Sequence, residues 1–150
     1  MTALRRRLPV LVGAVSAALA VVLAVAAGLL AAQSAPTETL AQARTHLTGL
    51  VLGVGGAGEP VVAEGAACPW LGIGPASRQV RPRVELHVPG DPSAVLDAAA
   101  RAGEVVERGA AGVEVRAAGG YVLTVRSSQG GEVVLVGESP CVWPGGTRTP

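Results

Sequence analysis

The stretch Val84–Ala102, with the sequence VELHVPGDPSAVLDAAARA, decides the fold that we predict for this chain. It begins with five residues that alternate between apolar and polar side chains, as in a β-strand with one buried face. Pro89-Gly90 then interrupts the alternation, Asp91 has the position of a helix N-cap, and Pro92 that of the first helical residue. The helix that follows has one apolar face, formed by Val95, Leu96 and Ala99. A strand followed directly by an amphipathic helix indicates a sheet that helices cover.

Downstream of this helix, three short segments show the alternation of half-buried strands. Gly103 is expected to close the helix as its C-cap. The apolar positions of the three segments are Val113 and Val115, then Tyr121, Leu123 and Val125, then Val133 and Leu135. Gly119-Gly120 and Gly130-Gly131 separate the segments and favour tight turns, so we predict an antiparallel meander.

Upstream, Pro36, Thr37 and Glu38 open a second helical pattern, with Thr37 as the expected N-cap. Its apolar face consists of Leu40, Ala43, Leu47 and Leu50. The glycines between Gly53 and Gly58 should end this helix, and a loop-rich stretch should follow through Gly74. The expected element order is therefore helix, strand, helix and three strands, which predicts an α+β domain with helices on an antiparallel sheet.

The N-terminus carries the strongest signal for location. Residues 8–32 contain no charge over 25 positions, and Arg5, Arg6 and Arg7 precede them directly. As a helix, this run would extend about 37 Å, which exceeds the hydrocarbon core of a bilayer. Because arginines beside a membrane span stay in the cytoplasm, we predict a cytoplasmic segment 1–7, a transmembrane anchor 8–32, an extracytoplasmic α+β domain 33–144 and a flexible tail 145–150.

A cleaved signal peptide is the alternative to this single-pass anchor, since it shares the basic start and the apolar run. Its apolar region is normally about 7–15 residues, which is shorter than the run seen here. The cleavage positions are also poor, because Pro36 follows Ala35 directly. Cleavage would leave a freely secreted domain instead of one attached to the cell membrane.

The chain has two cysteines, Cys68 and Cys141. On the outer side of a membrane an even number of cysteines indicates a disulfide, so we predict that these two are bonded. Closing a loop of this length could stabilise the domain by about 4 kcal/mol in the chain-entropy treatment. A redox-active pair would need two cysteines close together in the sequence, which this chain does not have.

Composition excludes nucleic acid as a partner. The chain has 12 basic residues, all arginine, against 11 acidic ones, for a net charge of +1, whereas nucleic-acid binders carry a basic face. Its aromatic residues are Trp70, Tyr121 and Trp143, too few for a stacking platform. The cluster of Arg78, Arg81 and Arg83 is expected to be solvated, with contact to anionic lipid headgroups as the alternative.

No cofactor or metal is expected. Gly53–Gly58 satisfies the pattern G-x-G-x-x-G, but the dinucleotide fingerprint needs a helix to begin at its last glycine, and Glu59-Pro60-Val61-Val62 is typical of extended chain. Glu85 and His87 should lie on one face of a strand, yet two ligands are fewer than metal sites use. An exposed polar surface is the expected role of this pair.

No catalytic residue is expected either. His46 and His87 are the only histidines, and Ser139 lacks both a nucleophile-elbow motif and a partner set. We therefore predict that the protein is not an enzyme and serves as a membrane-anchored binding or structural module of the cell envelope, with the lipid bilayer and an envelope component as partners. A cell-envelope hydrolase is the alternative, and a single cleft containing His46, His87 and a carboxylate would favour it.

As a whole, the chain resembles small exported or membrane-anchored proteins of actinobacteria that end in a Ser-Pro-Cys motif. The matching pieces are the basic, Ala/Val-rich start, Leu40–Leu50, Cys68, Val84–Ala102 and Gly137–Cys141. This resemblance implies an exported or anchored domain. It implies no activity and transfers no catalytic residue.

Overall fold

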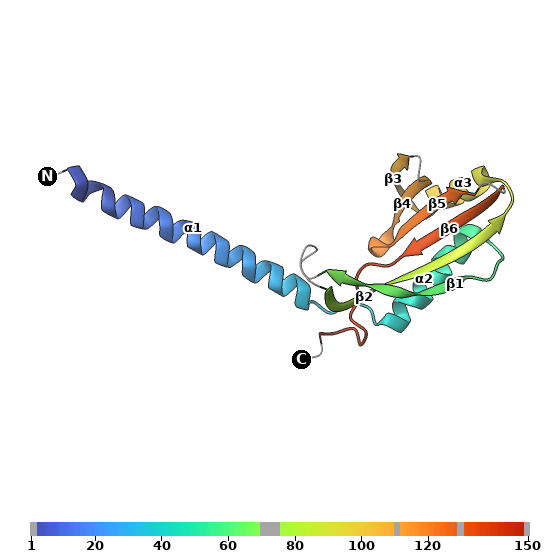
Figure 1. Ribbon diagram of the computed structural model, residues 1–150, viewed down its shortest axis with the longest axis horizontal. Coiled ribbons are helices and arrows are strands. Elements are labelled where there is room, and N and C mark those ends of the chain that lie inside the picture. Colours follow the sequence, from blue (N-terminus) through green and yellow to red (C-terminus); the bar gives the residue numbers. More distant parts are fainter. Residues whose placement is uncertain (1–2, 70–75, 110–111, 129–130, 149–150) are drawn as a thin grey trace. The chain divides into compact units, whose positions relative to one another are not determined.

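The computed structural model describes residues 3–69, 76–109, 112–128 and 131–148. The chain forms two compact units, Met1–Ala35 and Pro36–Pro150. The first unit is the helix α1, Ala3–Ser34, which is the long helix at the N-terminal end in Figure 1. Among the residues that the structure describes, no helix combines the length and the apolar character needed to cross a bilayer. The large apolar side chains that α1 exposes are Leu19, Val21, Val22, Leu23, Val25, Leu29 and Leu30.

The second unit is the predicted α+β domain, with two strands more than the sequence indicated. Its helices are α2 (Leu40–Gly55) and α3 (Pro92–Ala102). Its strands are β1 (Val61–Pro69), β2 (Ala76–Pro89), β3 (Gly103–Gly109), β4 (Gly112–Ala117), β5 (Val122–Ser127) and β6 (Glu132–Glu138), and a single 3-10 turn at Ala118–Gly120 joins β4 to β5. The predicted order of helix, strand, helix and three strands was therefore wrong, because it lacked β1 and β3.

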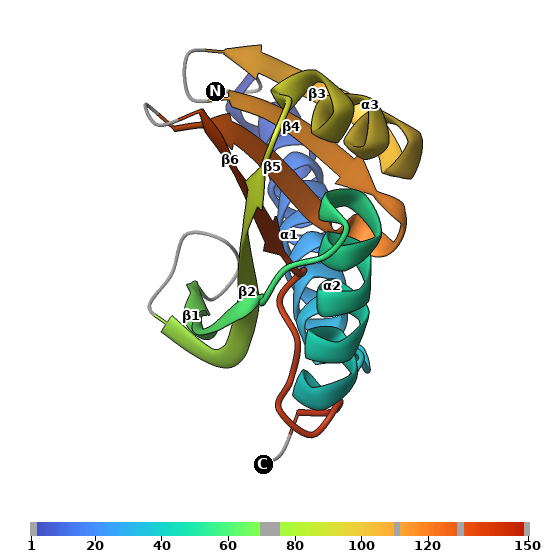
Figure 2. The same ribbon diagram turned by 90° about the vertical axis from the view of Figure 1, so that its right-hand side faces the viewer.

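The six described strands form one antiparallel sheet in the order β1-β2-β6-β5-β4-β3. The predicted meander is confirmed, since β3 to β6 follow one another along the chain and across the sheet. The last strand, β6, lies between β2 and β5 in the middle of the sheet. Helices α2 and α3 of this unit lie on the same face of the sheet, as Figure 2 shows, so this face holds the core.

Strand β1 was missed because its sequence lacks alternation. It occupies part of the stretch predicted as a loop, and its middle is a run of small residues, Gly65-Ala66-Ala67. Its pairing with β2 shifts register in two places. At Gly65 a Cβ atom would lie 2.5 Å from the carbonyl oxygen of Arg81, so only glycine allows the two backbones to approach this closely. The remainder of that predicted loop, through Gly74, lies outside the described residues.

Strand β3 was missed because it starts where the helix stops. Gly103, the predicted C-cap, has an extended backbone with φ −176° and is the first residue of β3. The register then shifts between Val105 and Glu107, which removes the alternation that identifies a strand. The predicted N-terminus of α3 is confirmed, because the Asp91 carboxylate accepts a hydrogen bond of 2.9 Å from the backbone N–H of Ser93.

Helix α2 begins later than predicted and ends, as predicted, among the glycines between Gly53 and Gly58. Its N-cap is Thr39 instead of Thr37, because Thr39 and Gln42 form a reciprocal capping box. The helix runs through Gly53 and ends at the C-cap Gly56, which has φ 78°. Two of the four predicted apolar positions are buried, and Leu40 and Leu50 are partly buried. The buried side chains of α2 are those of Ala43, Leu47, Val51 and Val54.

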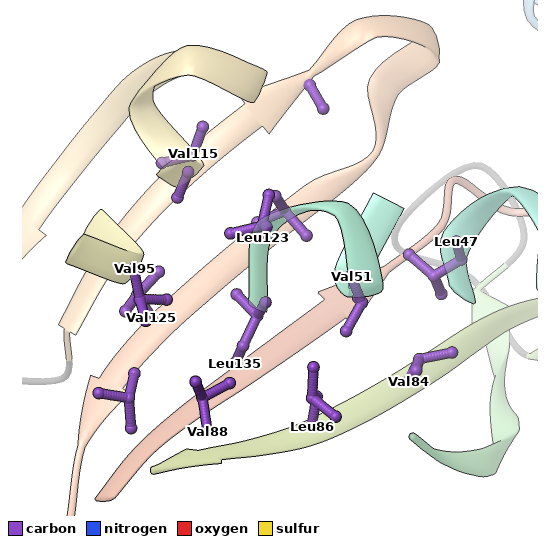
Figure 3. Close-up of a cluster of buried hydrophobic side chains, with 14 of the residues drawn as sticks. Leu47, Val51, Val84, Leu86, Val88, Val95, Val115, Leu123, Val125 and Leu135 are labelled. Carbon is purple, nitrogen blue, oxygen red and sulfur yellow. The ribbon is translucent and has the colours of Figure 1, made fainter. Parts of the chain in front are cut away.

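Gly137 sets the distance between α2 and the sheet. It lies in the central strand β6, where a Cβ atom would be 2.6 Å from Cγ2 of Val51 and 2.8 Å from Cδ1 of Leu47. Leu47 and Val51 therefore occupy the space that a side chain at this position would take (Figure 3). Around this point the aliphatic core contains Val84, Leu86, Val115, Leu123 and Leu135, each of them fully buried.

We predict that Gly137→Ala destabilises the folded domain by about 1–3 kcal/mol, the usual cost of an added methyl group in a packed core. Gly145→Ala is the matched control, because a Cβ atom there meets nothing within 4 Å. Urea unfolding of the full-length chain in detergent measures both variants. Equal unfolding midpoints for the two variants would show that α2 does not pack against Gly137.

Candidate functional site

The segment after β6, residues 139–146, ties several parts of the domain together, and we call it the C-terminal strap. Its Cys141 is disulfide-bonded to Cys68 in β1, 73 residues earlier in the chain. Val142 and Val80 exchange two backbone hydrogen bonds of 2.9 and 3.0 Å, which joins the strap to β2. Ser139 adds a backbone hydrogen bond of 3.1 Å to the carbonyl of Pro82. The strap thus fastens both strands of the β1–β2 hairpin.

The same strap holds the linker, residues 36–39, which leads into α2. Thr37 donates its backbone N–H to the carbonyl of Gly146 at 2.8 Å, and its hydroxyl accepts a hydrogen bond of 2.9 Å from the backbone N–H of Trp143. The backbone N–H of Leu40 bonds to the carbonyl of Pro144 at 3.2 Å. Gly146, which the sequence assigned to the flexible tail, is therefore hydrogen-bonded to the linker.

The predicted disulfide is present, and both cysteines lie where sequence-distant segments meet. Cys68 is 2% exposed, so its sulfur is protected from solvent. A bond over this separation lowers the entropy of the unfolded chain more than a short-range bond would. Trp70, one of the three aromatic residues of the sequence, lies outside the described residues.

We predict that reducing the disulfide destabilises the domain by about 4 kcal/mol or less, because native strain and residual structure lower the chain-entropy value. A maleimide should not label Cys68 or Cys141 without a reductant. Thermal unfolding with and without reductant measures the effect, and the double variant Cys68→Ala/Cys141→Ala serves as control, since a reductant should not change its midpoint. Efficient labelling of the untreated protein would disprove the bond.

A polar cluster forms where the linker meets the sheet, from Glu38, His46 and Tyr121. The Tyr121 hydroxyl donates to Oε2 of Glu38 at 2.5 Å, and Nδ1 of His46 lies 3.5 Å from Oε1. The rings of His46 and Tyr121 have centroids 4.5 Å apart. Burial of Tyr121 and its hydrogen bond to Glu38 raise the pKa of the phenol, so Tyr121 remains a donor at physiological pH.

Two hollows meet at Glu38. One, of about 230 Å³, is lined by Glu38, Tyr121 and the strap residues Pro140, Cys141 and Val142, among others. The other, of about 520 Å³, is an open depression on α2 lined by Glu38, Ala41, Gln42, Thr45 and His46. A carboxylate beside an imidazole and next to a hollow is the arrangement that a general base uses. The linker carboxylate Glu38 and its tyrosine partner had no signal in the sequence.

A second polar cluster lies on the face of the sheet opposite α2 and α3. His87 lies between two carboxylates, with Nε2 3.1 Å from Oε1 of Glu85 and Nδ1 3.1 Å from Oε2 of Glu132. The sequence predicted the pairing with Glu85. It could not predict Glu132, because this residue comes from β6, which pairs with β2 only in the folded sheet.

Arginines balance the negative charge of the carboxylates on this face. Arg83 is 3.2 Å from Glu85, and Arg81 is 3.9 Å from Glu138. Two of the three arginines of the predicted basic cluster are therefore in ion pairs, while Arg78 is exposed. Within the described part of the chain, no group of three or more metal-ligating side chains is close enough to hold a metal ion.

We predict that His87 titrates above its ordinary pKa of about 6.5. The hydrogen bond to Glu132 raises this pKa most, followed by the one to Glu85, because both stabilise the imidazolium. A raised pKa in the folded state stabilises the fold below the unfolded-state pKa, and this contribution is lost as the pH rises through the folded-state value.

An NMR titration of the two imidazoles measures this shift, with His87→Gln to assign the signal. Glu132→Gln should lower the pKa of His87, whereas Glu138→Gln, on the same face but paired with Arg81, should leave it unchanged. A His87 pKa that does not respond to Glu132→Gln would contradict the arrangement.

The remaining motifs have structural roles. A Cβ atom at Gly55 or Gly58 would lie 2.5 or 2.6 Å from a methyl carbon of Leu86, so these glycines of the G-x-G-x-x-G pattern allow the chain to pass over the sheet. The pattern begins in the last turn of helix α2, whereas the dinucleotide fingerprint follows a strand. Ser139 is buried and its hydroxyl bonds to the carbonyl of Pro140 at 2.8 Å.

The two histidines belong to different clusters, His46 on α2 and His87 on β2, and their described polar partners differ. No protein-family model, no curated protein and no solved structure matches the chain. The resemblance to small exported actinobacterial proteins therefore stays a prediction.

Proposed function

We propose that this protein is a membrane-anchored binding or structural module of the cell envelope. In this proposal α1 spans the membrane, residues 1–7 lie in the cytoplasm, and the domain with its C-terminal strap lies outside the cytoplasm. The observation that carries the proposal is the run of 25 uncharged residues, 8–32, which lies within a helix of 32 residues. Apolar side chains that α1 leaves exposed, such as Leu23 and Leu29, are suited to lipid.

The disulfide supports the outer location of the domain. Disulfides persist in oxidising compartments and are rare in the cytosol. Arg5, Arg6 and Arg7 favour the same orientation, because they precede the apolar run and keep the N-terminus inside. A domain released by cleavage near Ala35 would have the same disulfide and would differ only in attachment.

A cell-envelope hydrolase is the second candidate, and the pair of Glu38 and His46 is the observation that favours it. The pair lies beside a hollow, and Oε1 of Glu38 lies 3.5 Å from Nδ1 of His46. His87 is held by other carboxylates on the opposite face of the sheet, and the Ser139 hydroxyl is bonded to its own neighbour. Among the described residues, the pair of Glu38 and His46 therefore has no identified nucleophile beside it. For this reason we favour the binding module over the hydrolase.

We predict that the full-length chain stays in the membrane fraction after carbonate extraction and that a C-terminal alkaline phosphatase fusion is active. Replacing Arg5, Arg6 and Arg7 by glutamate should lower the fraction of active fusion, because the orienting charges are lost. A matched control replaces Arg78, Arg81 and Arg83, which lie after the apolar run. An inactive C-terminal fusion would overturn the proposed topology, and a mature N-terminus near Pro36 would show a cleaved signal.

A further inference from the structure

The two cysteines of the disulfide differ in their exposure. Cys68 is 2% exposed, whereas Cys141 is partly exposed. Cys141 also lines the hollow of about 230 Å³, next to the strap residues Pro140 and Val142 and opposite Tyr121 of the sheet. A thiol that approaches from solvent therefore has access to the bond from the Cys141 side, while Cys68 is protected from it.

A guanidinium lies beside the more accessible cysteine. Val80 and Val142 form an antiparallel bridge. Arg81 follows the first of them and Cys141 precedes the second, so the two lie opposite each other. Nη2 of Arg81 donates a weak hydrogen bond of 3.7 Å to Sγ of Cys141. Its Nη1 is 3.9 Å from Glu138, a longer and looser contact, and the positive charge is thus placed where it stabilises a thiolate.

The strap and the end of β1 depend on the disulfide to different degrees. The strap is also held by backbone hydrogen bonds to β2 and to the linker. The pairing of β1 with β2 shifts register twice, the second time between Ala67 and Pro69, so the end of this edge strand is held less regularly. Opening the bond should loosen residues 66–69 and leave Cys141 on the strap beside Arg81.

We propose that Cys141 is the sulfur at which an external dithiol exchanges with this disulfide, and that Arg81 stabilises the negative charge that develops there. In the first step a thiolate of the dithiol attacks Sγ of Cys141, the bond between the two protein sulfurs breaks, and Cys68 leaves as a thiolate that takes up a proton. In the second step the other thiolate of the dithiol attacks the reagent's own sulfur in the mixed disulfide and releases Cys141 as a thiolate beside Arg81.

Two electrons pass from the dithiol to the protein in this exchange. The dithiol becomes a disulfide, and the two cysteines of the protein become thiols. Loosening of the β1 end moves Cys68 away from the mixed disulfide, which slows the reverse attack. The inference goes beyond the proposed function, because it concerns the chemistry of the bond and holds for an anchored or a released domain.

The first test locates the sulfur that is attacked. The full-length chain in detergent micelles is treated with glutathione, a monothiol that stops at the mixed disulfide, and is quenched with acid at early times. Mass spectrometry of the peptides should find glutathione on Cys141 and a free thiol at Cys68. Glutathione bound to Cys68 instead would overturn the proposal.

The second test measures the contribution of Arg81 to the rate of reduction by dithiothreitol. Arg81→Gln should slow this reaction by about fivefold, the effect of one nearby positive charge in a solvent-exposed setting. Arg81→Lys should retain most of the rate. Arg83→Gln is the matched control, because Arg83 lies on the same strand and pairs with Glu85 at 3.2 Å, and it should react as the wild type does.

Circular dichroism establishes that each variant folds before its rate is compared. Equal rates for Arg81→Gln and Arg83→Gln, or a faster reaction of Arg81→Gln, would overturn the role of Arg81. A reduced protein of the thioredoxin type, at the same thiol concentration, is the second reagent. A faster reaction than with dithiothreitol indicates a protein-borne dithiol as the partner, and a slower one indicates a small thiol.

Hydrogen exchange of the reduced chain tests the local opening. The amides of residues 66–68 should exchange faster after reduction. The amides of Val80 and Val142, which bond to each other's carbonyls, should stay protected. Loss of protection at all of these positions together would show that reduction unfolds the whole hairpin, and would overturn the local opening of β1.

Discussion

The C-terminal strap is the constraint on which the rest of the domain depends. Because β6 lies in the middle of the sheet, the chain that leaves it at Ser139 passes close to both the β1–β2 hairpin and the linker. The disulfide to Cys68 holds the edge strand β1, whose own pairing is irregular, and hydrogen bonds hold the linker at Thr37 and Leu40. A core without phenylalanine buries less area per residue, so these ties account for a large share of the stability.

The order of the strands decides which charged groups meet. His87 acquires its second carboxylate, Glu132, only because β6 returns to pair with β2. Glu38 meets Tyr121 because the linker is held against the turn between β4 and β5. The cluster around His87 is balanced by arginines and open to solvent, whereas the cluster around Glu38 borders two hollows.

Glycine has two different roles in this protein. At Gly137 and Gly65 the absence of a side chain lets two elements of the same chain come together, and the fold explains it. At Gly119 and Gly120 the backbone has positive φ values of 73° and 79°, which glycine adopts without strain.

The sequence by itself determined the elements whose signals are local. The alternation of Val84, Leu86 and Val88, the Asp91 cap and the Gly119-Gly120 turn of the meander each depend on neighbouring residues, and the structure has all three. Strands β1 and β3 were not predicted, because small residues and register shifts removed the alternation of apolar and polar side chains. Only the tertiary structure decided the central place of β6, the partners of His87 and Glu38, and the hydrogen bonds between the strap and the linker. Those contacts join residues 45 to 109 positions apart, and their cost in chain entropy is met only when the whole core forms at once.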